Sequence, residues 1–220
     1  MNTLLENREL VTVRGASVSE QDNRSYLITS KETGAQVLID AADNIEQLRA
    51  LIASAAEDSV QPTRVVMIAT THQHWDHVRA LKDLAAETDA TTTAGTEDVE
   101  AIEKESGLRP EHSLEHDDVG QFPGFDLRAI HLRGHTPGSI AFVYEDPTGS
   151  PIILSGDSLF PGGVGNTWKD PERFASLISD VSARLFDRYP DDAVVYPGHG
   201  DPTTLGAERP HLDEWRERGW

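Results

Sequence analysis

The chain has no cysteine among its 220 residues. A disulfide, a thiolate metal ligand and a cysteine nucleophile are therefore excluded, and any metal must be bound through nitrogen and oxygen. Basic residues are also scarce, since 19 lysines and arginines stand against 38 aspartates and glutamates and the net charge is −19. Such a surface repels phosphate groups, so we expect neither nucleic acid nor a membrane as a partner. The simplest interpretation of the acidity is a solubilising surface.

Long apolar runs are missing as well. No stretch approaches the ~20 apolar residues that a membrane helix needs. The first ten residues, MNTLLENREL, lack the apolar segment of a signal peptide. We therefore expect a cytoplasmic protein. The length and the hydrophobic share of 37% fit one domain over residues 1–220.

The apolar pattern predicts strands that alternate with helices. Four segments have apolar residues at helical spacing. The third of them begins with Asp170, a capping residue, and Pro171, a first-turn proline. Two strand-rich halves, each with its own helices, predict two sheets packed together with helices outside. The expected strands cover residues 25–29, 35–40, 64–70, 125–132, 139–145, 151–157 and 192–198, and the expected helices cover residues 44–58, 77–88, 170–189 and 208–219.

Metal-ligand side chains crowd the segment after the predicted strand 64–70. The sequence TTHQHWDH contains His72, His74, Asp76 and His77, and so holds three of the chain's nine histidines. In an extended chain His72 and His74 point the same way, while Asp76 and His77 lie where the next helix starts and can face a second, adjacent point. These ligands would then serve two neighbouring ions rather than one. A polar loop with chance histidines explains this density poorly.

Further ligands are expected where later strands end beside glycine. His135 follows the strand 125–132, and Asp157 and His199 follow the last two predicted strands in the same way. Glycine tolerates the backbone conformations that bring a ligand into a crowded centre. The remaining histidines are interpreted as packing, surface or solvated residues, and they are His112, His116, His131 and His211.

The order of these motifs resembles the metallo-β-lactamase superfamily, over about residues 40–199. The resemblance implies an α/β (α+β) fold, the four-layer αβ/βα sandwich, in which two mixed sheets pack face to face with helices outside. It also implies two divalent metal ions at one edge of the sheets, expected to be Zn(2+), with Fe as the alternative. One ion would take His72, His74 and His135, the second would take Asp76, His77 and His199, and Asp157 would bridge both.

Within the superfamily, the segments GHTPGS and GDSLFPGGVGNT are similar to glyoxalase II and its small bacterial relatives. Class B β-lactamases lack a bridging aspartate at the position of Asp157, so the resemblance is not to them. Two departures from glyoxalase II argue against a glutathione-specific substrate. The chain ends 21 residues after His199, too soon for the C-terminal domain that holds glutathione, and Asn166 stands where relatives acting on small thiol adducts often have arginine.

The implied reaction is the hydrolysis of a small-molecule thioester, ester or lactone, with a metal-bridged hydroxide attacking the carbonyl. Asp76 is the candidate catalytic residue, which would orient the hydroxide and pass a proton to the leaving group. Asp40 is expected either to accept the free N–H of a ligand histidine or to cap the turn after its strand.

The candidate substrate-binding residues lie close to the ligands in sequence. Trp75 is expected at the rim of the site or in the core. Phe160 and the glycine-rich segment 161–169, which contains Asn166 and Trp168, suggest an exposed and flexible loop that contacts substrate. A plain glycine-rich turn into the next helix would give the same pattern.

Two other functions remain open. A mononuclear iron oxygenase acting on a persulfide would use His72, His135 and Asp157 and would keep the fold while changing the reaction. A redox module with a di-iron centre would not hydrolyse its ligand and would normally need a flavin partner.

Overall fold

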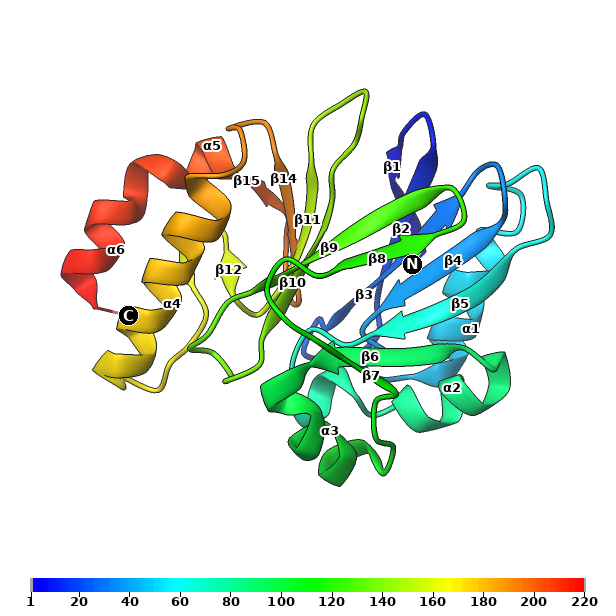
Figure 1. Cartoon of the computed structure of the whole chain (residues 1–220), viewed down its shortest axis with the longest axis horizontal. Coiled ribbons are helices and arrows are strands. Elements are labelled where there is room, and N and C mark those ends of the chain that lie inside the picture. Colours follow the sequence, from blue (N-terminus) through cyan, green and yellow to red (C-terminus); the bar gives the residue numbers. More distant parts are fainter. Residues whose placement is uncertain (1, 220) are drawn as a thin grey trace.

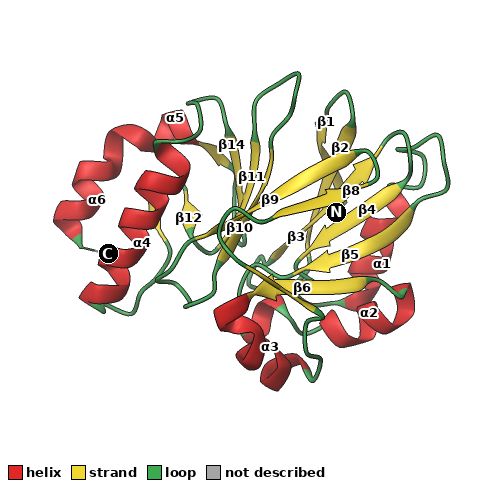
Figure 2. Cartoon of the chain, in the orientation of Figure 1, coloured by secondary structure: helices red, strands yellow, loops and turns green. Residues whose placement is uncertain are grey.

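Two large sheets form the centre of the molecule, and helices lie on the outer side of each (Figures 1 and 2). The structure, a computed structural model, describes residues 2–219. Met1 and Trp220, the ends of the expected domain, lie outside the described residues. The prediction of a four-layer αβ/βα sandwich is confirmed.

The first sheet has seven strands in sequence order. Each of its first four strands is antiparallel to the next, and the neighbouring pairs from the fourth strand onward are parallel. The fourth strand is buried along its whole length, as expected for a parallel strand covered on both faces. The strands are β1 (Thr3–Asn7), β2 (Val11–Ser17), β3 (Arg24–Ser30), β4 (Ala35–Ile39), β5 (Arg64–Ala69), β6 (Thr91–Gly95) and β7 (His112–Leu114).

The second sheet has six strands. Since β10 is antiparallel to both β9 and β11, and β11 is parallel to β14, the strands β9, β11 and β14 run in one direction. In spatial order the strands are β15 (Thr203–Thr204), β14 (Val194–Pro197), β11 (Ile152–Gly156), β10 (Ile140–Tyr144), β9 (Phe125–His131) and β8 (Val119–Phe122). A separate two-stranded ribbon joins β12 (Leu159–Phe160) and β13 (Gly163–Val164).

Three apolar clusters fill the interfaces between the four layers. One lies between the first sheet and its helices, one lies between the two sheets, and one lies between the second sheet and its helices. Among residues 2–219 no helix is long and apolar enough to cross a membrane. The helices on the first sheet are α1 (Ile45–Ser54), α2 (Leu81–Thr88) and α3 (Val99–Ser106), and those on the second are α4 (Pro171–Val181), α5 (Leu205–Glu208) and α6 (Leu212–Arg218).

Several predicted boundaries are wrong. The helix expected over 77–88 starts only at Leu81, because Trp75–His77 forms a separate 3₁₀ turn that carries two of the crowded ligands. The helix expected over 170–189 ends at Val181 and continues as one π-helical turn. The last helix is broken into short pieces around Pro210, whose ring nitrogen has no hydrogen to donate.

The carboxyl ends of the central strands meet at one edge of the sandwich. Hydrogen bonds join the two sheets there: the Ile140 amide donates to the Thr71 carbonyl at 2.8 Å, and the Tyr26 hydroxyl donates to the Pro197 carbonyl at 2.6 Å. Gly95, at the end of β6, lies so close to Gly138 that an added Cβ would be 2.0 Å from the Gly138 carbonyl oxygen. This edge is therefore held by close backbone contact between the sheets.

We predict that Gly95→Ala lowers the free energy of unfolding by about 2–3 kcal/mol, because the new methyl group meets backbone that cannot move aside. Urea denaturation at a fixed zinc concentration measures the change. Gly163→Ala is the control, since its Cβ would meet only a guanidinium nitrogen of Arg218, at 3.0 Å, on a flexible side chain. Equal unfolding midpoints for Gly95→Ala and the parent protein would contradict the close approach.

Candidate metal centre

The structure brings together all seven side chains that the sequence singled out as metal ligands. They form three overlapping groups in which the ligand atoms lie within 4.8 Å of one another. The loops after β5, β9, β11 and β14 supply them, as the sequence predicted from the strand ends. The groups are His72 with His74 and His135, His72 with His77 and Asp157, and Asp76 with His77 and His199.

The first trio consists of His72, His74 and His135. The Nδ1 atom of His74 lies 3.0 Å from Nε2 of His72 and 3.0 Å from Nε2 of His135. His72 and His135 are buried, while His74 is half-buried. Three nitrogen atoms therefore face one point, from two different loops.

The second trio consists of Asp76, His77 and His199. The Nε2 atoms of His77 and His199 are 3.2 Å apart, and the Asp76 Oδ2 atom lies 3.5 Å from His199 Nε2 and 4.0 Å from His77 Nε2. His77 is fully buried, but the side chains of Asp76 and His199 are 19% and 25% exposed. The second trio is therefore the more open of the two.

Asp157 lies between the two trios. Its Oδ2 atom is 3.6 Å from Nε2 of His135 and 3.6 Å from Nε2 of His199, and its Oδ1 atom is 3.6 Å from Nε2 of His77. Oδ1 is buried without a hydrogen-bond partner. Gly198 packs tightly against this carboxylate, since a Cβ at position 198 would lie 2.2 Å from Oδ1. A buried, unpartnered carboxylate oxygen facing imidazole nitrogens fits a cation at this position.

The outward nitrogens of the histidines fix which ring atom faces the centre. His135 Nδ1 lies 2.9 Å from the Asn166 carbonyl oxygen, and His199 Nδ1 lies 2.9 Å from the Gln21 carbonyl oxygen. A carbonyl oxygen only accepts, so each Nδ1 carries the hydrogen and, in the neutral ring, each Nε2 turns a lone pair toward the centre. Lone pairs that converge in this way suit a metal ion, and the donor set of imidazoles and carboxylates suits zinc or iron.

Asp40 orients one histidine of each trio. Its Oδ2 atom accepts from His77 Nδ1 at 2.8 Å and from the Thr71 hydroxyl at 2.7 Å, and that hydroxyl oxygen lies 3.0 Å from Nδ1 of His72. Its Oδ1 atom accepts from the Thr71 amide at 2.7 Å. The Asp40 carboxylate thus contacts His77, a candidate ligand, and it also holds the turn that follows β5.

Two buried residues that sequence reasoning missed hold the ligand loops in place. Asp98 accepts hydrogen bonds from the Gln73 amide at 3.0 Å, the Thr136 hydroxyl at 2.5 Å and the Gly138 amide at 2.7 Å. It thereby ties the loop of the first two histidines to the loop of His135. Asp98 lies just beyond the end of β6, as the candidate ligands lie beyond other strands, but the sequence TTTAG of β6 has no apolar run that would have revealed the strand.

The other missed residue is Asn23, which is also buried. Its side-chain amide donates to both the carboxylate and the carbonyl oxygen of Asp76, each at 3.0 Å. Nothing in the sequence marked Asn23, because it lies in a turn between the first strands, far from the ligand motifs.

Electrostatics differ between the trios. Burial lowers the pKa of His135 to about 3 and holds the pKa of His72 well below its usual range, so both rings are neutral at neutral pH. Burial opposes the charge of His199 too, but its hydrogen bond with Asp76 and the nearby Asp157 raise its pKa to about 9. The second trio therefore lies in a negative field that favours a positive charge.

Asp76 is ionised at neutral pH. Burial alone would raise its pKa, yet the hydrogen bonds from His199 and Asn23 hold the pKa of Asp76 well below its ordinary value. An ionised carboxylate at the open side of the cluster can accept a hydrogen bond from a water molecule or a substrate group.

The candidate substrate residues fall in different places. Trp75 is 44% exposed, so it is not in the core, and its ring lies over the Arg79 guanidinium, with Cζ 3.7 Å from the ring centroid. Phe160 is half-buried in β12. The backbone carbonyl of Asn166 holds His135, and the side chain of Trp168 packs against the first trio.

The segment 161–169 is not the wholly exposed loop that its glycines suggested. It contains β13, and Gly163 and Gly165 are buried. A Cβ at position 165 would lie 1.8 Å from the Asp157 carbonyl oxygen. Position 165 therefore requires glycine because the backbone packs closely under the cluster, and not because the loop must be flexible.

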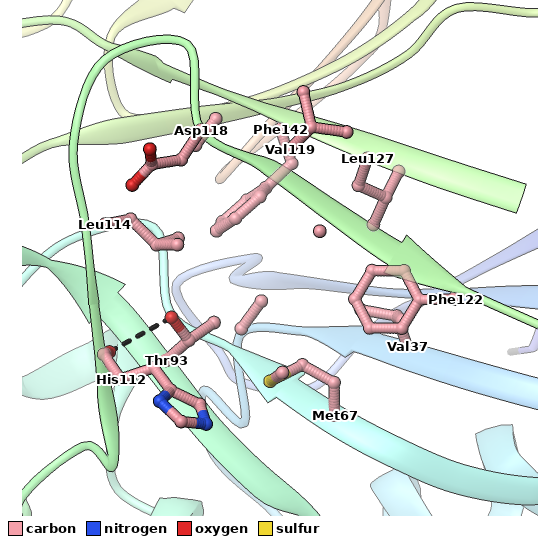
Figure 3. Close-up of a pocket in the computed structure, with 13 residues that line it drawn as sticks. Val37, Met67, Thr93, His112, Leu114, Asp118, Val119, Phe122, Leu127 and Phe142 are labelled. Carbon is pink, nitrogen blue, oxygen red and sulfur yellow. Dashed lines mark hydrogen bonds between the residues drawn. The ribbon is translucent and has the colours of Figure 1, made fainter.

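An apolar cavity of about 280 Å³ opens elsewhere, between the two sheets where β7 passes into β8 (Figure 3). Met67, Phe122 and Phe142 line it, and the polar side chains of His112 and Asp118 lie among the lining residues. None of the seven candidate metal ligands is among them. The cavity is therefore separate from the candidate metal centre.

The sequence profile of the metallo-beta-lactamase superfamily matches residues 20–199. The chain belongs to this superfamily. The resemblance inferred from the order of the motifs is thereby confirmed, as is the expectation of an enzyme of this fold whose substrate is unspecified.

Several proteins resemble this superfamily member. Hydroxyacylglutathione hydrolase GloC of Haemophilus influenzae is 35% identical over 92 residues, which cover 42% of this chain and 42% of GloC. The hydroxyacylglutathione hydrolase-like protein of mouse is 31% identical over 81% of this chain and 58% of its own length. The chain thus spans less than two thirds of either relative. The crystal structure of TTHA1623 in a di-iron-bound form has a TM-score of 0.70 and 29% identity, covering 89% of this chain and 96% of TTHA1623.

We predict that Asp40→Asn lowers metal affinity about 10–100-fold, the usual effect of removing an acceptor behind a ligand histidine. The asparagine amide would donate toward His77 Nδ1, which moves the hydrogen of this buried ring to Nε2, the atom that faces the centre. Competition with a chromophoric chelator at pH 7 measures the affinity.

The matched control for that experiment is Asp58→Asn. Asp58 also accepts three hydrogen bonds, from Thr12 and Arg14, but it lies outside the cluster, so metal affinity should be unchanged. A folded Asp40→Asn protein with the affinity of the parent would show that Asp40 does not orient a ligand.

Proposed function

We propose that this chain is a dinuclear metal-dependent hydrolase that cleaves a small-molecule thioester, ester or lactone at its carbonyl group. The observation that carries the proposal is the position of Asp157, whose carboxylate lies 3.6 Å from imidazoles of both trios. A carboxylate shared in this way suits two ions side by side. The similarity to two hydroxyacylglutathione hydrolases supports hydrolysis as the reaction.

The proposed ligand sets follow the two trios. His72, His74 and His135 would hold one ion, Asp76, His77 and His199 would hold the second, and Asp157 would bridge them. We propose zinc for both positions, because histidine and carboxylate ligands without thiolate are common in catalytic zinc sites. Two such ions lower the pKa of water and polarise a carbonyl group, which suits a chain that offers no cysteine nucleophile.

Asp76 is the proposed catalytic residue. Its carboxylate is ionised and partly exposed, and Asn23 fixes its orientation through two hydrogen bonds from one amide group. It can therefore accept a hydrogen bond from the attacking water, take its proton and deliver that proton to the departing thiolate or alkoxide. The leaving group then lies on the side of the cluster where Asp76 and His199 are exposed.

The alternatives change the metal or the reaction. The di-iron form of TTHA1623, a protein of similar fold and 29% identity, favours iron as the second candidate metal. A mononuclear iron oxygenase would use His72, His135 and Asp157 and would leave the second trio without a role, although that trio is complete. A di-iron redox module would fill both trios without hydrolysis.

Elemental analysis and turnover, measured on one preparation made without added metal, test the function. We expect near two zinc ions per chain together with hydrolysis of small thioesters and activated esters. Asp157→Ala should lose metal from both positions and lose activity, since its carboxylate serves both trios. One iron per chain would support the oxygenase, and two irons without hydrolysis would support the redox module. Full metal occupancy in Asp157→Ala would contradict the bridging assignment.

Asp76→Asn separates metal binding from proton transfer. Asparagine keeps an oxygen for the metal but cannot accept a proton, so we expect the second metal position to weaken and the first to be kept. With excess zinc restoring occupancy, kcat should still be about 10²–10⁴-fold below the parent value, the usual worth of general acid–base help. The measurement is kcat against zinc concentration, with occupancy determined on the same samples. Recovery of both occupancy and kcat would show that Asp76 binds metal and does not transfer the proton.

A further inference from the structure

Trp168 lies against the first trio and remains 53% exposed. Its ring stacks on His135, with centroids 5.4 Å apart and planes 28° apart, and it meets His74 edge-on, with centroids 5.5 Å apart. An exposed aromatic ring beside candidate metal ligands offers apolar surface at the place where a substrate would lie.

The backbone under this ring is held in an uncommon conformation. Trp168 and Lys169 are consecutive residues with φ of 54° and 61°, in the left-handed region that bulky side chains rarely adopt. The Asn166 side-chain oxygen accepts from the Trp168 amide at 2.7 Å, and the Thr167 carbonyl accepts from the Asp170 amide at 3.0 Å. Such strain persists only where surrounding contacts determine it, and it is concentrated at ligand-binding sites.

Arg173 fixes the ring from the first turn of α4. Its Cζ atom lies 4.5 Å from the centroid of the Trp168 ring, a cation–π contact. The same guanidinium donates to the Gly134 carbonyl at 2.8 Å and to the His135 carbonyl. Trp168 is therefore positioned relative to His135 by the backbone on one side and by Arg173 on the other.

Trp168 and Asp76 lie at opposite ends of the cluster. The ring contacts of Trp168 are with His74 and His135, whereas the contacts of Asp76 are with Asn23, His77 and His199. If Asp76 delivers a proton to the leaving group, the leaving group lies at its end. The acyl group of the substrate must then extend toward the other end, where the Trp168 side chain is partly exposed.

We propose that Trp168 is the acyl-binding wall of the site and selects substrates whose acyl group carries an aromatic ring. An aromatic acyl group would pack against the exposed part of the indole ring, which a methyl group is too small to cover. This inference rests on the proposed hydrolase function. It adds to that function the chemical class of the acyl group and the residue that recognises it.

The test compares the S-phenylacetyl and S-acetyl thioesters of N-acetylcysteamine on zinc-loaded protein. Because a wall contacts ground state and transition state alike, Trp168→Ala should raise KM for the phenylacetyl thioester about five- to ten-fold while kcat changes little. Both constants for the acetyl thioester should stay nearly unchanged, and Trp168→Phe should keep most of the preference. Val60→Ala is the control, since it removes an exposed apolar side chain outside the candidate site, and it should keep the parent's ratio of the two KM values.

A binding measurement without turnover separates this inference from the hydrolase proposal. Calorimetric titration of zinc-loaded protein with phenylacetate and with acetate should show tighter binding of phenylacetate by the parent and loss of that preference in Trp168→Ala. If the parent hydrolyses neither these two thioesters nor activated esters and lactones assayed beside them, the hydrolase proposal fails, whereas the titration still decides the role of Trp168. Equal phenylacetate affinity in the parent and Trp168→Ala, an equal fall for acetate and phenylacetate, or the same loss in Val60→Ala would each overturn the assignment.

Discussion

The candidate site depends on one constraint, which is that imidazole lone pairs must converge on a common centre. Neutral rings do not hold that arrangement unaided, and the outward nitrogens of four of the five histidines have an acceptor that fixes them. Carbonyl oxygens hold His135 and His199, and the buried carboxylate of Asp40 holds His77 directly and His72 through the Thr71 hydroxyl. The acceptors come from separate parts of the chain, so the ligand geometry depends on the whole fold.

The same constraint explains why the sheets touch so closely at this edge. Ligands from the first sheet and from the second must come within hydrogen-bonding distance of one another, which leaves little room between the layers. The Asp98 carboxylate satisfies three donors from two ligand loops, and the contact between Gly95 and Gly138 admits no side chain. A buried carboxylate that accepts several hydrogen bonds positions backbone strongly, because leaving any one of the donors unsatisfied is costly.

Sequence reasoning identified the seven clustered side chains because histidine is rare in this chain and because all seven positions lie at or just beyond the ends of predicted strands. Histidine and aspartate just beyond an apolar run mark the ends of buried strands, and those ends meet in space. Asp98 follows the same rule, but β6 is the threonine-rich segment TTTAG and gave no apolar signal to reveal the strand. Asn23 has no local signal at all, since its importance comes only from its contact with Asp76, 53 residues away.

Burial across the cluster also defines how a substrate can approach. His72 and His77 lie at the buried base, whereas Asp76, His199 and Trp168 form its exposed parts. The carbonyl of the proposed substrate would therefore enter from the side where those three residues are accessible. With the roles proposed for Asp76 and Trp168, which lie at opposite ends, a substrate would lie along the line between the two trios. The two ends differ, because one is charged and hydrogen-bonding and the other is aromatic. This difference would fix the orientation of a bound substrate as well as its position.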